Sequence, residues 1–264
     1  MMGIAIDPGH ITDENQKLSS FYDLSKYNNY NEDKNKVSLK SMLSMSSGFQ
    51  GDDNDYNNPG NENNMYDLAD WVKFALDQPM DKTESIGKRW KYFTAGSVVL
   101  GDVIHKSVPH GLEEFAKINF FEPLNILNYQ WQYTPKKVPS TAGGLALKSL
   151  DLAKFGQMYQ DGGVWKGKQI VSKTWVEKSF TKHIALPENY KGFYGYQFWN
   201  KRFEINGKSY EAWYCTGNGG NKIYIFKDVP FIVVVTASAY GTAYAHVQVK
   251  KMMEEYILPA ILQE

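Results

Sequence analysis

The sequence predicts an α+β fold in which helices dominate the first half and antiparallel strands the last third. Candidate amphipathic helices recur up to about residue 150, whereas apolar strand candidates crowd into residues 210–238. Helices and strands in separate stretches of a chain are typical of this class. We therefore expect a mainly helical region with long polar loops over residues 1–150, and an α/β region with C-terminal antiparallel strands and a terminal helix over residues 151–264.

Composition indicates a globular chain that is not adapted to nucleic acid. The 264 residues are 42% hydrophobic and 15% aromatic, which is ample for a packed core. Lysine plus arginine equals aspartate plus glutamate at 29 each, so no overall field attracts nucleic acid or an anionic membrane. No apolar run approaches the roughly 18 residues of a membrane span. The single cysteine, Cys215, excludes an internal disulfide.

Helices in the first region are predicted from apolar spacing and from cap residues. Ser38 is a candidate N-cap, Gly48 marks the end of the first helix, and Pro79 stops the second. The opening MMGIAID has the pattern of a helix tail and lacks the features of a signal peptide. The predicted helices are 38–47, 66–76, 95–106 and 112–120.

Residues 51–64 are almost wholly Asp, Asn, Gly, Glu and Pro, which predicts an exposed loop. The aspartates at 52, 53 and 55 suggested a calcium loop as an alternative. They lack the alternating oxygen ligands and closing glutamate of an EF-hand, so we reject that interpretation.

In the second region helices and hairpins alternate. Ser149 and Ser172 are candidate caps of two helices, the first ended by Gly162. Asn206-Gly207 is the strongest short hairpin signal in the chain. The remaining predictions are a hairpin over 165–171, a strand over 194–199, strands over 210–215, 222–227 and 230–238, and a helix over 245–257.

A glycine-rich turn, TGNGGN, joins two of these strands and is the first candidate site. Glycines at 217, 219 and 220 let the backbone approach a ligand and present N–H groups that side chains would otherwise block. An oxyanion site needs such donors. The alternative is a flexible connection between strands, because glycine also serves turns.

The chain resembles the serine β-lactamase-related hydrolases, a family that includes class C β-lactamases, penicillin-binding proteins, esterases and 6-aminohexanoate-oligomer hydrolases. The resemblance covers nearly the whole chain in the family's order. Its motifs are SLKSMLSMSSGF, IGKRWKYFTAGSVVLGDVI, AGGLALKSLDLAKFGQMYQDGGVWKGKQIVSKTWVEKS and GNGGNKIYIF before an apolar strand. It implies a β-lactamase/transpeptidase-like fold with an antiparallel sheet flanked by helices and a mainly helical region.

The resemblance also implies three catalytic motifs: Ser-x-x-Lys, Tyr-x-Asn or Tyr-x-Ser, and a Lys-Thr-Gly-like strand. Tyr92 and Thr94 match the second motif, with threonine as a departure. The third maps onto Cys215-Thr216-Gly217, or onto Tyr214-Cys215-Thr216, and neither register supplies the usual lysine or histidine. We take Cys215, Thr216, Gly217, Asn218, Gly219 and Gly220 as the substrate or oxyanion edge, which we expect the Tyr92 hydroxyl to face.

The first motif is absent from its place, and we expect the chain to be an N-terminally truncated member of the family. In relatives the nucleophile helix continues into something like GIAID, which puts the serine roughly eight residues before Met1. N-terminal strands of the sheet would be missing as well. Two accidental matches, Ser85 to Lys88 and Ser179 to Lys182, come at the wrong point in the family's order.

Two classes of function remain open. The first is a serine hydrolase that cleaves an ester, amide or lactam through an acyl-enzyme, although residues 1–264 by themselves are expected to be inactive. The second is a non-catalytic ligand-binding relative or an inactive fragment. We expect no metal and no cofactor, because the five histidines are scattered and no phosphate or dinucleotide loop occurs. A periplasmic or secreted location would fit the family, but the sequence does not decide the compartment.

The run IVVV at residues 232–235 predicts a strand that is covered on both faces and both edges. The hairpin before it supplies one neighbour. The resemblance implies that the other neighbour is an N-terminal strand, so we expect an exposed apolar edge that favours self-association.

Overall fold

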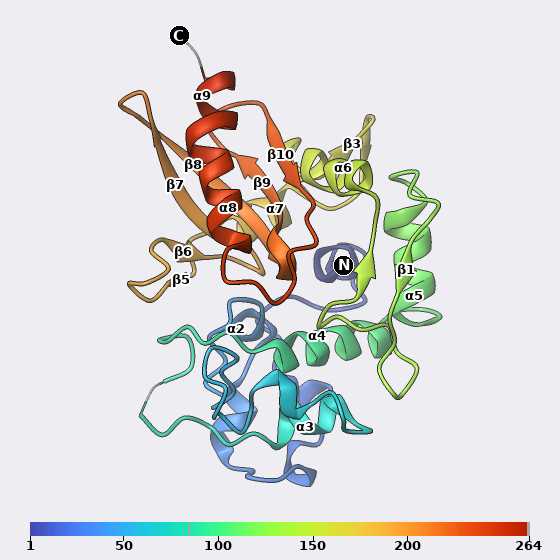
Figure 1. The fold of residues 1–264 in the computed structure, drawn as a ribbon. Coiled ribbons are helices and arrows are strands. Elements are labelled where there is room, and N and C mark those ends of the chain that lie inside the picture. The colour runs from blue at the N-terminus through green and yellow to red at the C-terminus, as the bar shows by residue number, and fades with distance from the viewer. Residues whose placement is uncertain (84, 263–264) are drawn as a thin grey trace. The chain divides into compact units, whose positions relative to one another are not determined.

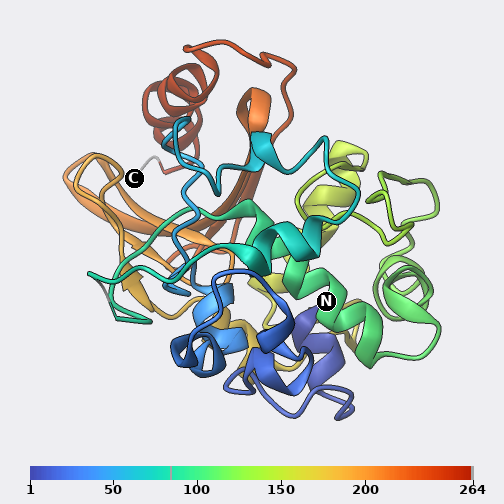
Figure 2. The same ribbon diagram turned by 90° about the horizontal axis from the view of Figure 1, so that it is seen from below.

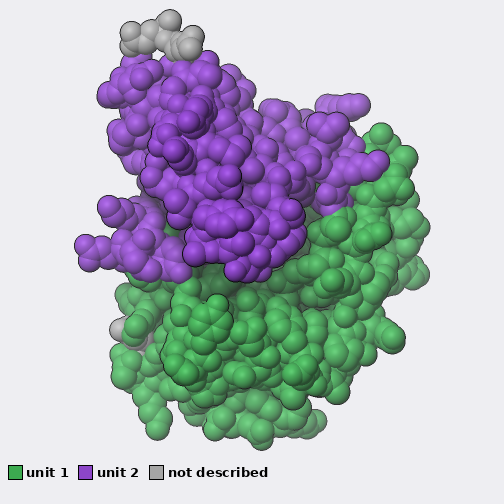
Figure 3. Space-filling view, viewed as in Figure 1, with its two compact units in different colours: residues 1–146, 183–187 green, residues 147–182, 188–264 purple. Residues whose placement is uncertain are grey.

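The computed structural model describes residues 1–83 and 85–262, which form two compact units. Unit 1 comprises residues 1–146 and 183–187, and unit 2 comprises residues 147–182 and 188–264, with the last two residues outside the description (Figure 3). Within the described chain no helix has both the length and the apolar character needed to cross a membrane.

Unit 1 is mainly helical with long irregular connections (Figure 1). Its core is formed by the central helix and the short helices that pack on it. The elements are α1 (Met2–Ile6), η1 (Leu18–Ser20), η2 (Leu24–Lys26), η3 (Glu32–Lys36), α2 (Leu39–Leu43), η4 (Glu62–Asn64), α3 (Trp71–Asp77), α4 (Thr94–Ser107), α5 (Gly111–Ala116), η5 (Lys117–Phe121), β1 (Gln130–Trp131), β2 (Leu145–Ala146) and β5 (Ile184–Ala185).

Caps determine where the short helices of unit 1 begin. Ser38 caps α2 as predicted, because its hydroxyl accepts from the Ser41 N–H at 3.2 Å and Ser41 returns a bond to the Ser38 backbone. The helix ends at Leu43, earlier than predicted, since Met45 adopts φ 54°. The helix predicted over 66–76 begins only at Trp71, where the Asp70 side chain accepts from the Lys73 N–H.

The helix α4 is the central element of unit 1, and its prediction over 95–106 is confirmed with one further residue at each end. Val99 and Val103 are fully buried, and α1, α2, α3 and α5 all pack on this helix. The next helix was predicted over 112–120. It is observed as α5, which continues without a break into the π-helical turn η5 up to Phe121.

Unit 2 contains an antiparallel sheet in which β10, β9, β8, β7 and β6 are neighbours in that order. A separate two-stranded hairpin, β3 with β4, lies at the predicted place. The elements of the unit are α6 (Ser149–Gln160), β3 (Val164–Trp165), β4 (Lys168–Gln169), α7 (Lys173–Ser179), β6 (Phe193–Tyr194), β7 (Trp199–Ile205), β8 (Lys208–Gly217), η6 (Asn218–Gly220), β9 (Asn221–Phe226), β10 (Ile232–Val235), α8 (Ala245–Lys251), η7 (Met252–Ile257) and α9 (Leu258–Ile261).

The register of the sheet follows from its turns. Asn206 and Gly207 both have positive φ, 50° and 74°, and they close the β7–β8 hairpin by pairing Ile205 with Lys208, as predicted. The single strand predicted over 194–199 was wrong. The chain turns at residues 195–198, so that β6 and β7 pair with each other.

Each face of this sheet is covered by helix. On one face Tyr224 and Phe226 pack with Val249 and Met253 of the C-terminal helix, which crosses the strands in Figures 1 and 2. On the other face α6 lies against β9 and β10. Gly156 permits this approach, since a Cβ there would lie 3.0 Å from side-chain atoms of Ile223 and Ile232.

The two predicted caps of unit 2 differ in outcome. Ser172 caps α7, since its hydroxyl accepts from the Trp175 N–H at 3.2 Å. Ser149 does not cap α6: Lys148 occupies the cap position without a side-chain bond, and the Ser149 hydroxyl pairs with Thr236 at 2.9 Å.

Candidate active site

Tyr92 lies on the segment that enters α4 and is half-buried. Its ring lies beside that of buried Trp90, with 5.9 Å between ring centres. The neighbouring residues are tied to Met45, whose carbonyl accepts from the Lys91 N–H at 2.9 Å and whose sulfur accepts from the Phe93 N–H at 3.3 Å. The segment is therefore held on both sides of the tyrosine.

Tyr92 lies before the helix, whereas Thr94 is the first residue of α4 and is 6% exposed. Its backbone N–H donates to Asp53 Oδ2 at 2.6 Å. The backbone N–H of Thr94 is thus hydrogen-bonded within the protein.

The span 51–64 is more ordered than its composition predicted. Asn61 is 1% exposed, and its side-chain amide donates to the carbonyls of Asp53 and Asp55. Gly51 is buried against the Phe93 ring, which would lie 2.1 Å from an added Cβ. The description as an exposed loop was wrong for these positions, because side-chain amides satisfy the loop backbone from within.

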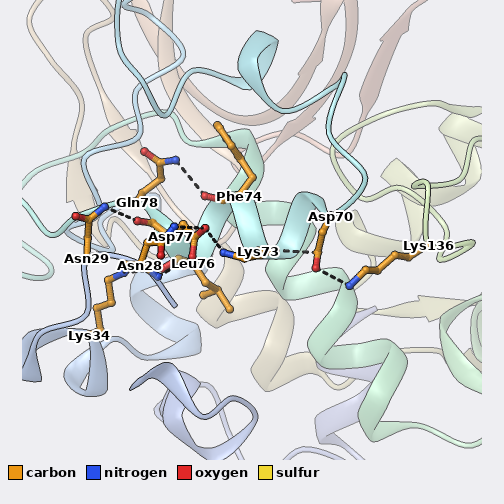
Figure 4. Close-up of polar contacts among 10 residues, drawn as sticks. All are labelled: Asn28, Asn29, Lys34, Asp70, Lys73, Phe74, Leu76, Asp77, Gln78 and Lys136. Carbon is orange, nitrogen blue, oxygen red and sulfur yellow. Dashed lines mark hydrogen bonds and ion pairs between the residues drawn. The ribbon is translucent and has the colours of Figure 1, made fainter. Parts of the chain in front are cut away.

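The helix α3, which packs on α4, is secured by a buried lysine (Figure 4). Lys34 Nζ donates to the carbonyls of Asn28 at 2.7 Å and Leu76 at 2.6 Å, so it satisfies an otherwise unpaired carbonyl of the last helical turn. Burial lowers the pKa of Lys34 to about 8. Asp77 accepts from the Asn28 N–H at 2.8 Å and pairs with Lys73.

In unit 2 the glycine-rich turn is anchored by amide side chains. Asn221 Nδ2 donates to the carbonyls of Asn218 at 2.7 Å and Ala237 at 3.1 Å, and its Oδ1 accepts from the Ala237 N–H. Gly219 and Gly220 have φ 76° and 95° and are buried. The turn therefore has a defined conformation, which argues against the flexible connection considered above.

The glycines of the turn are not equivalent as oxyanion donors. The Gly219 N–H already donates to Asn218 Oδ1 at 2.7 Å, and Tyr240 would lie 2.9 Å from a Cβ at this glycine. Gly217 is exposed, and a Cβ there would meet only Asn221 at 3.3 Å. Of the predicted edge, the backbone around Gly217 is the part with open surroundings.

Cys215 and Thr216 are adjacent on β8 and differ in what surrounds their side chains. Burial raises the pKa of the Cys215 thiol to about 12, so it is not a thiolate at neutral pH. The Thr216 hydroxyl accepts a hydrogen bond from Lys222 on the paired strand β9. Burial, and next the charge of Lys201, lower the pKa of Lys222 to about 8.

Neither accidental Ser-x-x-Lys match has the geometry of a nucleophile. Ser179 is the last residue of α7, is 1% exposed, and donates to the Trp175 carbonyl at 2.8 Å. Lys182 pairs with Glu211 at 2.6 Å. Ser85 and Lys88 form a turn rather than a helix start, with the Lys88 N–H donating to the Ser85 carbonyl.

Residues 1–83 and 85–262 contain no group of three or more His, Cys, Asp or Glu side chains placed to hold an ion. His105 has a structural role, because its Nδ1 accepts from the Leu112 N–H at 3.2 Å where α5 begins.

Sequence reasoning missed two residues of this candidate site, Asp53 and Lys222. Asp53 was considered only as a calcium ligand, and its bond to Thr94 spans 41 positions. Lys222 follows the glycine turn, and the pairing Thr216 with Lys222 follows from a tight turn over Asn218–Gly220. Counting that register from the sequence would have placed Lys222 opposite Thr216.

Comparison with known proteins identifies the family. Residues 13–252 match the family model described as Beta-lactamase. This chain belongs to the β-lactamase family. The family resemblance and the β-lactamase/transpeptidase-like fold predicted from the sequence are thereby confirmed.

Solved structures agree on the fold at low sequence identity. A protein described as a 6-aminohexanoate-dimer hydrolase from Bacillus anthracis superposes with TM-score 0.75 and 18% identity over 94% of this chain and 66% of its own. A penicillin-binding protein from Bacillus halodurans gives 0.67 and 19% over 96% and 82%, and a family VIII carboxylesterase gives 0.66 and 13% over 94% and 78%. The chain thus spans 66% of the Bacillus anthracis protein.

Tyr92 and Thr94 belong to unit 1, and Cys215 to Gly220 belong to unit 2. That the Tyr92 hydroxyl faces the glycine turn stays a prediction.

Proposed function

We propose that this chain forms part of a serine hydrolase that cleaves an ester, amide or lactam through an acyl-enzyme. The observation that supports this most is the β-lactamase family match over residues 13–252, which includes both Tyr92 and the glycine turn. Tyr92 would transfer the proton, and the backbone around Gly217 would bind the oxyanion. Thr216, held by Lys222, would contact the substrate.

The proposed reaction has two steps. A serine oxygen forms a bond to the substrate carbonyl carbon while its proton passes to the lysine and tyrosine pair. The bond to the leaving nitrogen or oxygen then breaks, and the leaving atom takes up that proton. In the second step water forms a bond to the acyl carbon, the bond from that carbon to the serine oxygen breaks, the acid product leaves, and the serine oxygen takes up a proton from the water.

The nucleophile of this reaction is proposed to come from a Ser-x-x-Lys outside residues 1–264. Ser179 is buried at the end of α7 and bonded to its own helix, and Ser85 lies in a turn, so neither stands at the start of a helix with its lysine one turn later. The alternative is a non-catalytic relative that binds similar ligands, or an inactive fragment.

Labelling with a fluorophosphonate tests this assignment. We expect no adduct on residues 1–264 expressed alone, by intact mass, and a stoichiometric adduct on the protein translated from the full reading frame. Ser85→Ala and Ser179→Ala in that full protein are the controls, and both should still label. An adduct on Ser85 or Ser179 would contradict the assignment, and absence of label from the full protein would favour the non-catalytic alternative.

A further inference from the structure

Asp53 makes two hydrogen bonds to the backbone that directly follows Tyr92. Its backbone N–H donates to the Tyr92 carbonyl at 2.8 Å, and its Oδ2 accepts from the Thr94 N–H at 2.6 Å. One residue, 39 positions before the tyrosine, thereby holds the two peptide groups that follow Tyr92, one on each side of Phe93. Two bonds across this short segment restrict rotation of the backbone that carries the ring.

Asp53 is itself held in place. Its second oxygen, Oδ1, accepts from the Glu62 N–H at 2.7 Å, and Asn61 Nδ2 donates to its carbonyl at 3.2 Å. Two residues earlier, Gly51 lies against the Phe93 ring. The hydrogen bonds of Asp53 therefore join the Tyr92 segment to a loop that is itself held in place.

The carboxylate also satisfies the start of α4. The cap position of this helix is Phe93, which has no side-chain hydrogen bond to offer. A helix of 14 residues leaves its first N–H groups unpaired and carries positive partial charge at that end. Asp53 provides the missing acceptor from a distant part of the sequence, with a charge of the favourable sign.

We propose that Asp53 is the positioning residue for Tyr92, and that it sets the direction of the tyrosine side chain through the Tyr92 and Thr94 backbone. This rests on the proposed function, in which Tyr92 transfers the proton. Asp53 contacts no reacting atom in this scheme and acts through the tyrosine. A misplacement of about 1 Å in a reacting group can reduce a rate by roughly 10²-fold.

The charge state of Asp53 gives the proposal a pH signature. Burial raises the pKa of this carboxyl to about 6, against the hydrogen bonds from Thr94 and Glu62, and the Glu62 charge raises it further. Glu62 and Tyr66 are the titratable groups that interact with Asp53. The Tyr66 hydroxyl donates to Glu62 Oε2 at 2.6 Å. Below pH about 6 the protonated carboxyl is a weaker acceptor for its two N–H donors.

The first test follows backbone amide chemical shifts with pH. In residues 1–264, the amide proton shifts of Thr94 and Glu62 should titrate together with a midpoint near pH 6, because both N–H groups donate to Asp53. Asp53→Asn should abolish this titration. Asp52→Asn is the matched control, since the Asp52 carboxylate accepts from the N–H and the side-chain amide of nearby Asn54, and it should leave the titration in place. Flat shifts for Thr94 between pH 5 and 7 would overturn the connection.

The second test uses the full protein and its turnover. We expect Asp53→Asn to lower kcat by roughly 10- to 100-fold with little change in KM, and to remove an acid limb near pH 6 from the kcat profile. In a Tyr92→Phe background the same change should have almost no further effect. Full additivity of the two changes would overturn the positioning role. If Tyr92→Phe alone leaves kcat unchanged, the proposed role of Tyr92 is wrong, while the amide titration still decides whether Asp53 holds the segment.

Discussion

Lys222 is a half-buried ammonium on β9, and no ion pair joins it to a carboxylate in residues 1–83 and 85–262. It donates to Thr216 and lies 5.2 Å from the centre of the Tyr214 ring. A charge that leaves water without an opposite partner costs free energy, which is why the pKa falls to about 8. Lys222 therefore holds a proposed substrate contact at a cost in stability.

The stability of a Lys222→Met variant tests this cost. The pKa of Lys222 is lower in the folded than in the unfolded chain, so its charge is unfavourable in the folded state at pH 7, and this penalty shrinks as pH rises from about 8 to 10. After allowance for solvent screening and for the lost bond to Thr216, we expect Lys222→Met to raise the free energy of unfolding at pH 7 by about 1 kcal/mol. The gain should fall toward zero or below at pH 10.

Urea unfolding at both pH values measures this difference. Lys227→Met, at an exposed position after the same strand, is the matched control and should change little at either pH. A Lys222→Met variant that is less stable than wild type at pH 7 by more than about 1 kcal/mol would show that the bond to Thr216 outweighs the burial of the charge.

At the residue scale the sequence predicted side chains with a local or motif-based signal, and the structure supplied the rest. Ser38 and Ser172 were predicted as caps from their position before helices and are confirmed, whereas the role of Tyr92, chosen from its motif, stays a prediction. Asp53 could not be predicted in this way. Three aspartates lie close together in this part of the sequence, and only the folded structure shows which of them accepts from the Thr94 N–H. Burial of Lys222 likewise depends on the strands on either side of it, β8 and β10, which the folded sheet brings together.

At the element scale, prediction succeeded where periodicity and turn chemistry agree. The helix α4 and the Asn206-Gly207 hairpin combine both signals and were placed within one residue. The helix predicted over 66–76 began five residues late, because Asp70 is a stronger start than the apolar pattern before it. The helices α5 and α8 continue into the π-helical turns η5 and η7. A 3.6-residue apolar period in the sequence does not distinguish a π-helical turn from the α-helix before it.

The strand β10 provides a prediction at this scale. Within the described residues, β10 pairs with β9 alone. The four residues of β10, Ile232–Val235, are half-buried, although helices cover both faces of the sheet. An apolar edge with unpaired backbone groups is a site for strand pairing between chains. We expect residues 1–264 to self-associate at micromolar concentration through this edge.

Sedimentation and hydrogen exchange measure that association. Val234→Lys should shift the chain toward monomer, since an edge lysine opposes strand pairing. Val247→Lys, at a position of α8 that is 65% exposed, is the matched control and should leave association unchanged. A well-folded monomer with slow amide exchange at residues 233–235 would show that the edge is already covered.

At the scale of the whole molecule, the ordered set of weak motifs was the most informative feature of the sequence. Each stretch alone is common, but their order over residues 13–252 is that of the β-lactamase family. The sequence could not predict that Gly219 and Gly220 are packed inside the turn while Gly217 is open, because this depends on Tyr240 and Ala245 from a later segment. Substrate choice depends on such loop packing and is not encoded in the motifs.

Turnover of a Tyr92→Phe variant, measured in a protein that joins residues 1–264 to the proposed Ser-x-x-Lys, tests most sharply whether this chain carries the proton-transfer tyrosine of a serine hydrolase. With a simple ester as substrate, we predict a loss in kcat of roughly 10²–10⁴-fold, the usual contribution of a group that transfers a proton. Tyr66→Phe, which removes a neighbouring hydroxyl bonded to Glu62, is the control and should retain nearly full activity. A Tyr92→Phe variant with wild-type kcat would contradict the claim.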